Sequence, residues 1–158
     1  AIHLGETLML SVAEIMTREP FTLGPDNTLT DAAQLMREHA IRHIPIVDSA
    51  GGVIGLVSHR DVLAASDSSL LRDDALEQDT DGKESYVALS SVMSAPVKTT
   101  DEHASLLGAA LTLRQQRLGC LPITSDGQLV GIISDSDFLE VAITLLEQME
   151  MSDPEEMD

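Results

Sequence analysis

Two stretches of this chain repeat one another in a single register. The shift is 77 residues and falls to 76 after a one-residue deletion, which is the pattern of a structural repeat. The matched stretches are 15–17 with 92–94, 44–46 with 121–123, and 53–58 with 129–134. Two copies of about 55 residues each lie near the size at which a single core is marginal. We therefore expect the copies to pack on each other as one module.

The spacing of apolar and turn residues in each copy predicts five elements in the order β-α-β-β-α. Apolar residues recur at helical spacing over 28–40, whereas 53–57 is an almost continuous apolar run typical of a buried strand. Residues 48–52, Asp-Ser-Ala-Gly-Gly, suit a tight turn between antiparallel strands. The predicted strands cover 21–23, 44–47, 53–57, 98–99, 121–124 and 129–133, and the predicted helices cover 28–40, 58–64, 105–117 and the residues from 134 onward.

These elements divide the chain into four parts. The parts are a first repeat at 11–66, an acidic polar linker at 67–87, a second repeat with an amphipathic terminal helix at 88–147, and an acidic tail at 148–158. The linker is rich in Ser and Asp and has a weak helical pattern around Leu70 and Leu71. The tail is expected to fray.

The charge of the chain excludes several classes of partner. Its 9 Lys and Arg against 27 Asp and Glu give a formal net charge of −18, which repels phosphate backbones and anionic membranes. Only Phe21, Phe138 and Tyr86 are aromatic, so the stacking platforms of single-strand binders are missing. Cys120 is the single cysteine, and no apolar run approaches the ~18 residues of a membrane span. We expect a cytoplasmic protein that binds neither nucleic acid nor membrane.

The repeated motifs resemble the CBS domain, present here as a tandem pair over about residues 11–145. Each copy begins with Met-Thr or Met-Ser, carries hydrophobic-Pro-hydrophobic in its middle strand, and follows its third strand with Gly-x-x-Ser-x-x-Asp. The resemblance implies an α+β module in which two β-α-β-β-α CBS repeats pack with pseudo-twofold symmetry. It also implies adenine-nucleotide clefts between the repeats and a flat homodimeric disk. With no catalytic domain in the sequence, we expect a free-standing regulatory module.

The motif that follows the third strand has the parts needed to hold a ribose phosphate. It opens a helix, whose N-terminus presents unpaired N–H groups and a positive dipole end to phosphate. Asp61 is the carboxylate that would accept from both ribose hydroxyls, and Gly55 permits close approach to the backbone. The residues of this motif are Ser58, His59, Arg60 and Asp61 in the first copy and Ser134 and Asp137 in the second.

The same spacing is also a helix-capping pattern. Ser/Thr-x-x-Asp/Glu satisfies a helix N-terminus without any ligand. The pattern occurs four times, as Ser11 with Glu14, Thr28 with Asp31, Ser58 with Asp61 and Ser134 with Asp137. Only the last two pairs follow a Gly-containing apolar strand, and there capping and ligand binding can coexist. The Ser58 motif ranks higher as a phosphate site, because the Ser134 motif adds the carboxylate of Asp135, which would repel phosphate.

The resemblance also implies which residues hold the base. They are the segment after the first Met and the residues that flank the middle-strand Pro. In this chain they are Thr17, Thr22, His43, Pro45 and Ile46 and, in the second copy, Ser94, Thr99, Cys120, Pro122 and Ile123. Several are core positions in any case. His43 suits a hydrogen-bonded structural histidine better than a direct ligand contact, and Cys120 suits a small buried hydrophobe better than a reactive thiol.

We therefore expect a regulatory module that binds an adenosine-containing small molecule and reports it through its conformation or association. The candidate ligands are AMP, ADP, ATP, NAD and S-adenosylmethionine; no cofactor is required, and the sequence leaves open whether Mg²⁺ accompanies the phosphates. The alternative is a constitutive dimerisation or scaffolding module without a ligand. No catalytic motif or metal-ligand spacing is present, so we expect neither an enzyme nor a metal site. A homodimer and a protein effector complete the expected partners.

Overall fold

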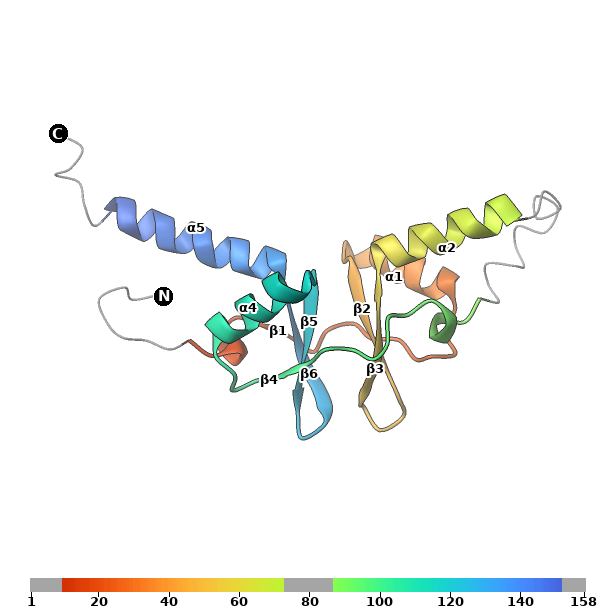
Figure 1. The fold of residues 1–158 in the computed structure, drawn as a ribbon, viewed down its shortest axis with the longest axis horizontal. Helices are drawn as coiled ribbons and strands as arrows, with labels where there is room; N and C mark the ends of the chain where they lie inside the picture. The colour runs from red at the N-terminus through yellow and green to blue at the C-terminus, as the bar shows by residue number, and fades with distance from the viewer. Residues whose placement is uncertain (1–9, 73–86, 152–158) are drawn as a thin grey trace.

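The computed structural model describes residues 10–72 and 87–151, with the backbone alone for 67–72. It consists of two similar halves placed side by side, each with a hairpin below and helices above in the view of Figure 1. The first half contains α1 (Leu29–His39), β2 (His43–Val47), β3 (Val53–Ser58) and α2 (His59–Arg72). The second contains β4 (Thr100–Asp101), α4 (Leu106–Gln116), β5 (Cys120–Ser125), β6 (Gln128–Ser134) and α5 (Asp135–Met151). Two short 3₁₀ helices, η1 (Val12–Glu14) and η3 (Leu89–Ser91), and the short strand β1 (Thr17–Arg18) complete the described elements.

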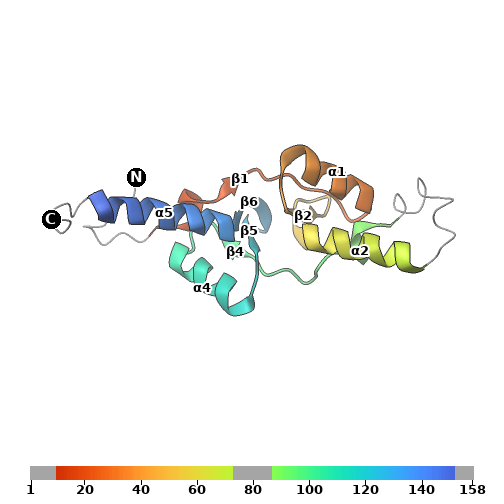
Figure 2. The same cartoon turned by 90° about the horizontal axis from the view of Figure 1, so that it is seen from above.

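Both halves follow one sheet plan. The second half contains a four-stranded sheet of order β1-β6-β5-β4, and the first half contains the antiparallel pair β2-β3. Isolated bridges from Ser94 to Leu56 and from Leu23 to Ile46 extend that pair at the two equivalent edges. Viewed from above, α2 and α5 extend in opposite directions and α1 and α4 lie on opposite sides, as an approximate twofold axis requires (Figure 2). The α+β class, the two β-α-β-β-α repeats and their pseudo-twofold packing are confirmed.

The predicted helices and central strands agree with the structure, but the edge strands do not. Thr28 and Ser105 are the N-caps of α1 and α4, as the helical spacing indicates. The strands expected at 21–23 and 98–99 are wrong: within 21–23 only Leu23 forms a bridge, and the second edge strand is Thr100–Asp101. An edge segment that pairs over one or two residues leaves no hydrophobic periodicity to read.

Helix α2 runs to Arg72, well beyond the predicted end at 64, and it includes Leu70 and Leu71. The remaining linker residues from 73 to 86 and the tail from 152 to 158 lie outside the described residues.

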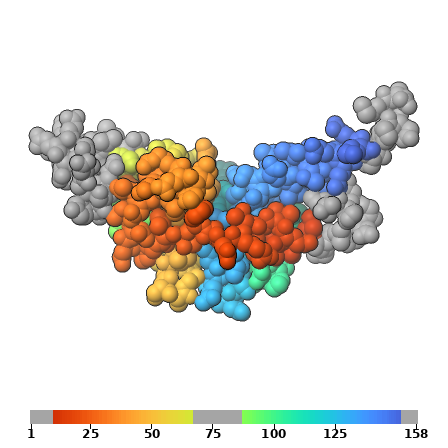
Figure 3. Space-filling model, turned by 180° about the vertical axis from the view of Figure 1, so that it is seen from behind, coloured from red at the N-terminus to blue at the C-terminus, as the bar shows by residue number. Residues whose placement is uncertain are grey.

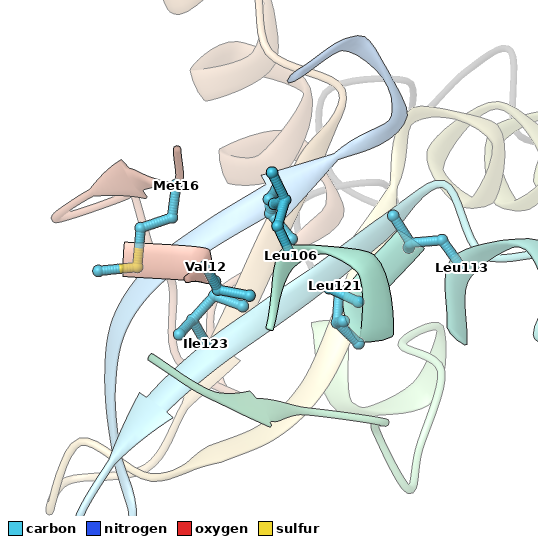
Figure 4. Packing of buried hydrophobic residues seen from close by; sticks show 8 residues of the cluster. Val12, Met16, Leu106, Leu113, Leu121 and Ile123 are labelled. Carbon is cyan, nitrogen blue, oxygen red and sulfur yellow. The ribbon is translucent and has the colours of Figure 1, made fainter. Parts of the chain in front are cut away.

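Each half completes its core with a segment that comes before the other half in the chain. Val12 and Met16 are buried with Leu106, Leu121 and other residues of the second repeat (Figure 4). In Figure 3 the red N-terminal segment accordingly lies beside the blue second repeat. Leu89, which precedes the second repeat, is buried in the core of the first. The two cores are therefore interlocked by chain exchange.

Backbone hydrogen bonds fix these crossing segments in place. Val12 N donates to Ala104 O at 2.9 Å, and Leu106 N donates to Leu10 O at 2.7 Å. In the first half, Leu29 N donates to Val87 O at 2.9 Å, and Leu89 N donates to Asn27 O at 2.8 Å. The same kind of exchange thus occurs on both sides of the pseudo-twofold axis.

Glycines in β3 and β6 make room for the crossing segments. A β-carbon at Gly55 would collide with the side chain of Met93, and one at Gly131 would collide with the side chain of Met16. The expectation that Gly55 admits a ligand to the backbone is therefore wrong, because Met93 occupies that space. The glycines serve the packing of the two repeats.

Substituting Leu89→Ala tests this exchange. We expect a loss of about 2–5 kcal/mol in the free energy of unfolding, because the side chain is fully buried in the core of the first repeat. Urea unfolding followed by circular dichroism measures the loss. The matched control is Leu107→Ala, whose side chain is 70% exposed and should change stability by less than about 0.5 kcal/mol. A Leu89→Ala protein as stable as the control would contradict the interlocked cores.

Candidate ligand clefts between the repeats

All four predicted capping pairs are present. Ser58 N donates to Asp61 Oδ2 at 2.9 Å, and Asp61 N donates to Ser58 Oγ at 3.1 Å. Ser134 N likewise donates to Asp137 Oδ2 at 2.8 Å. The pairs Thr28 with Asp31 and Ser11 with Glu14 also form capping boxes. The capping interpretation is confirmed, and the carboxylate of each aspartate after a third strand is hydrogen-bonded at a helix N-terminus. Within the described residues, however, Ser134 Oγ donates to Asp137 Oδ2 and accepts no bond from Asp137 N, so the second box is half formed.

Capping uses only part of each carboxylate. Within the described residues, every hydrogen bond that the carboxylates of Asp61 and Asp137 accept is made to Oδ2. Oδ1 of both residues is therefore open to another donor, such as a sugar hydroxyl. Both side chains are half-buried.

A cavity of about 550 Å³, here called the Thr17 cleft, lies at the junction of the two repeats. It is lined by Thr17, Arg18, Glu19, Pro20, Phe21, Ala40, Ile41, Arg42, His43, Ile132, Ser134, Asp135, Ser136 and Asp137. These residues come from the segment around β1, the turn between α1 and β2, and the junction of β6 with α5. Its lining includes the apolar residues Pro20, Ile41 and Ile132 together with two arginines and three carboxylates.

Strand pairing explains why the cleft contains residues of both copies. Thr17 in β1 pairs with Ile132 in β6. Because β6 ends at Ser134, this pairing places Thr17 near the start of α5. The equivalent pairing holds Ser94 to Leu56, with Leu56 N donating to Ser94 O at 3.1 Å. The sequence did not say which base-holding segment belongs with which aspartate. The structure combines them crosswise: Thr17 lies with Asp137, and Ser94 lies beside the strand that leads to Asp61.

A second cavity of about 610 Å³ concentrates positive charge. This arginine cavity is lined by Arg42, Arg60 and Arg117, with His43, His59, Ser58, Leu63, Leu118, Gly119 and Asp135. Three of the chain's nine basic residues therefore meet one carboxylate at this site. In a protein of net charge −18 this cavity is therefore a local concentration of positive charge. Arg42, His43 and Asp135 line both cavities, so the two are neighbours.

His43 occupies the wall that the two cavities share. Its ring is half-buried against Gly119, where a β-carbon would lie 3.1 Å from His43 Nε2 and 4.0 Å from Asp135 Oδ2. Burial lowers the pKa of His43 below its usual value; Asp135 and Asp61 oppose this shift and Arg42 adds to it. The imidazole is therefore neutral near pH 7 and presents one donor and one acceptor.

The remaining sequence-predicted residues separate into core and surface positions. Pro45, Ile46, Pro122 and Ile123 are buried in the two sheets and line neither the Thr17 cleft nor the arginine cavity. Thr22, Ser94 and Thr99 are exposed or half-buried and also lie outside these cavities. Cys120 is 2% exposed, and burial, aided by Asp137 and Asp135, raises its thiol pKa well above the usual value. It therefore stays a protonated, buried thiol at neutral pH.

Arg60 was predicted from its motif and lines the arginine cavity, but sequence reasoning missed Arg18, Arg42 and Arg117. Arg18 and Arg42 line the same cleft as Ser134 and Asp137, so the Ser134 motif is not a purely acidic site. Arg117 ends α4 in the left-handed conformation (φ 55°), at the position that Ala40 holds in the first repeat (φ 54°). The scarcity of Lys and Arg was a usable signal, because Arg42 and Arg117 each lie within four residues of a predicted middle strand.

Phe21 also contributes to the Thr17 cleft and was not predicted. Its ring stacks on His39 with centroids 3.9 Å apart and an interplanar angle of 19°. Within the described ranges, no group of three His, Cys, Asp or Glu side chains is placed to hold a metal ion. None of the described helices combines the length and apolarity needed to cross a membrane.

The comparisons with known proteins agree with this architecture. The profile of the CBS domain family matches residues 12–68 and 89–144, and the chain belongs to this family. A protein of Vibrio cholerae named for acetoin utilization (AcuB) is 41% identical in sequence. Its structure superposes with a TM-score of 0.78 over 91% of this chain and 99% of that one.

Two more distant solved structures share the fold. CBSX2, solved in complex with AMP, is 23% identical with a TM-score of 0.69, over 85% of this chain and 97% of that one. The CBS domain pair of protein MJ0100, solved with 5′-methylthioadenosine and S-adenosyl-L-methionine, is 22% identical with a TM-score of 0.68, over 85% of this chain and 96% of that one.

The lowered pKa of His43 predicts a pH dependence of stability. The folded state binds a proton at His43 less readily than the unfolded state does, so stability is greatest above the unfolded value near 6.5 and is lost as pH falls below it. We expect the thermal midpoint of the wild type to fall between pH 7.5 and 5.5 more steeply than that of His43→Gln. Equal slopes for the two proteins would contradict the burial of a neutral imidazole at this position.

Proposed function

We propose that this protein is a regulatory module that binds an adenine nucleotide at the junction of its repeats. The observation that carries the proposal is the carboxylate of Asp137, which is fixed by capping through Oδ2 and keeps Oδ1 available at the edge of the Thr17 cleft. A rigid acceptor at a helix N-terminus suits the vicinal hydroxyls of a ribose. The apolar wall of Pro20, Ile41 and Ile132 suits the base.

The charges favour a ligand with phosphates. The Thr17 cleft holds two arginines against three carboxylates, whereas the neighbouring arginine cavity holds three arginines against one. A nucleotide with its base and ribose in the Thr17 cleft would extend its phosphates past His43 toward Arg60 and Arg117. AMP, ADP and ATP fit this division of charge better than S-adenosylmethionine, which has no phosphate. NAD would need space for its second nucleoside.

Relatives support the ligand class. CBSX2 binds AMP and the MJ0100 pair binds two adenosine derivatives without phosphates, so the shared fold accommodates the adenosine group in those proteins. In this chain the arginine cavity is the feature that would select among adenosine ligands. We propose a homodimer in which the bound nucleotide changes the arrangement of the repeats and hence the association with a protein effector.

The second candidate is a constitutive dimerisation module. It is favoured by α5, where Leu139 and Leu146 are 61% and 59% exposed. This apolar surface is present without any ligand and could serve a permanent contact between copies. The two candidates differ in whether a nucleotide stabilises the protein.

Thermal unfolding with AMP, ADP, ATP, NAD and S-adenosylmethionine, each with and without Mg²⁺, tests the proposal. A ligand at 100 times its Kd adds about 2.7 kcal/mol to the free energy of unfolding. We expect Asp137→Ala to abolish the gain at the Thr17 cleft. Asp31→Ala is the matched control, since it removes an equivalent helix cap away from both cavities and should keep the gain.

Two results would overturn the proposal. If none of the five compounds raises the midpoint of the wild type, the constitutive dimerisation module is the better account. If Asp137→Ala and Asp31→Ala retain the same gain, the carboxylate of Asp137 does not hold the ligand. Asp61→Ala, measured in parallel, reports on the equivalent motif of the first repeat.

The arginine cavity predicts selectivity between ligands. Substituting Arg117→Gln should weaken ATP binding by roughly tenfold or more, because a hydrogen bond to a charged group contributes about 1.5–3 kcal/mol. Binding of S-adenosylmethionine should not change. Isothermal titration calorimetry measures both, with Arg114→Gln, outside both cavities, as the control. Equal losses for both ligands would show that the cavity does not receive the phosphates.

A further inference from the structure

We propose that His43 links phosphate binding in the arginine cavity to pH: when its imidazole gains a proton, an anion with phosphate groups binds more tightly. The inference rests on the proposed function and deepens it, because it adds a second signal, pH, that the same site reports. It depends on three features: the place of His43 between the two cavities, the charges that face its ring, and ring nitrogens that are open to a ligand.

His43 lies at the junction of the two repeats. It is the first residue of β2 and pairs with Ser58, the last residue of β3, so it lies beside the start of α2. Its ring contacts the second repeat, where a β-carbon on Gly119 would lie 3.1 Å from Nε2 and 3.4 Å from Cε1. Glycine at this position leaves room for the ring. One imidazole therefore contacts both repeats and lines both cavities.

Opposing influences act on the protonation of this ring. Burial, the largest of them, lowers the pKa of His43, and Arg42 lowers it further, whereas Asp135 and Asp61 raise it. The other charged or titratable residues that line the two cavities are Arg18, Glu19, Asp137, His59, Arg60 and Arg117. With burial dominant, the ring is neutral near pH 7 while no anion is bound.

Both ring nitrogens are available to a ligand. Among the residues that the structure describes, the side chain of His43 makes no hydrogen bond. A neutral imidazole donates from one nitrogen and accepts at the other, whereas the protonated ring donates from both. Gaining a proton therefore adds a positive charge and a second donor on the wall that the two cavities share.

A bound phosphate favours the protonated ring. The three arginines of the arginine cavity outnumber its one carboxylate, so an anionic group is drawn to the lining that includes His43. An opposite charge within about 4–6 Å of a histidine stabilises its protonated form. The imidazolium then acts as a fourth cation and can donate to phosphate oxygens. Binding thus takes up a proton, and by linkage the affinity for phosphate rises as pH falls.

The same proton discriminates between ligand classes. A nucleotide brings phosphates to His43, whereas S-adenosylmethionine has no phosphate and carries a positive sulfonium group. The protonated ring therefore favours the nucleotide alone. His43 is a specificity-determining residue whose effect depends on pH.

Nuclear magnetic resonance of the histidine side chains measures the linkage at His43 itself. The wild-type protein is titrated with acid, alone and with tripolyphosphate or ATP, and single His→Gln substitutions assign the signals of the five histidines. We expect each phosphate compound to raise the titration midpoint of His43 by about one pH unit, which corresponds to a tenfold gain in affinity. The midpoint of His103, which is exposed and lines neither cavity, should stay unchanged.

Tripolyphosphate separates this inference from the proposed function, because it carries phosphates without a nucleoside. If tripolyphosphate raises the midpoint of His43 and no nucleotide stabilises the protein, the proton linkage stands and the proposed function fails. If neither tripolyphosphate nor ATP raises the midpoint, the proton linkage is overturned, even where a nucleotide stabilises the protein.

Isothermal titration calorimetry with tripolyphosphate at pH 7.5 and 5.5 gives an independent measurement. The ratio of the two affinities should be roughly tenfold larger for the wild type than for His43→Gln. Protonation of the ligand itself is the same for both proteins and cancels in this comparison. His103→Gln is the matched control and should keep the wild-type ratio. An unchanged ratio in His43→Gln would overturn the inference, and so would a ratio that is lost in His59→Gln but kept in His43→Gln.

Discussion

The rest of this structure depends on the exchange of the segments that enter the two repeats. Met16 passes over Gly131 and Met93 passes over Gly55, so each core is closed by chain that precedes the other repeat. A repeat of about 55 residues is near the size at which a single core is marginal, and the exchange packs the two cores together. The clefts follow from the same constraint, since the exchange brings Thr17 to the start of α5.

Much of the fold was readable from the sequence because its signals are local or repeated. The helical spacing over 28–40, the turn at 48–52 and the 77-residue register each reflect one element or one symmetry. The strands at 21–23 and 98–99 were misplaced because a pairing of one or two residues leaves no pattern. The role of Gly55 was misread, because the neighbour that fills its open side, Met93, lies 38 positions away in the chain.

Only part of the candidate site could be predicted from the sequence, because residues distant in the chain form it. Ser134, Asp137 and Thr17 carry motifs, but only the crosswise pairing of strands shows that they share a cleft. Arg42 and Arg117 carry no motif, and their meeting depends on how the repeats pack. Charge is therefore unevenly distributed: three arginines line one cavity, whereas the charged residues of α5 are all acidic. Composition gave the net charge of −18 but not this distribution.

The central claim is that each candidate ligand cleft is built from both repeats. Its most direct test is the titration of ¹⁵N-labelled protein with AMP, ATP and S-adenosylmethionine, followed through amide chemical shifts. For a ligand that binds, the account predicts that the amides of 17–21 and 134–137 move together along one saturation curve. If the amides of 17–21 move instead with those of 58–61, or if none of the three ligands moves either group, the crosswise cleft is contradicted.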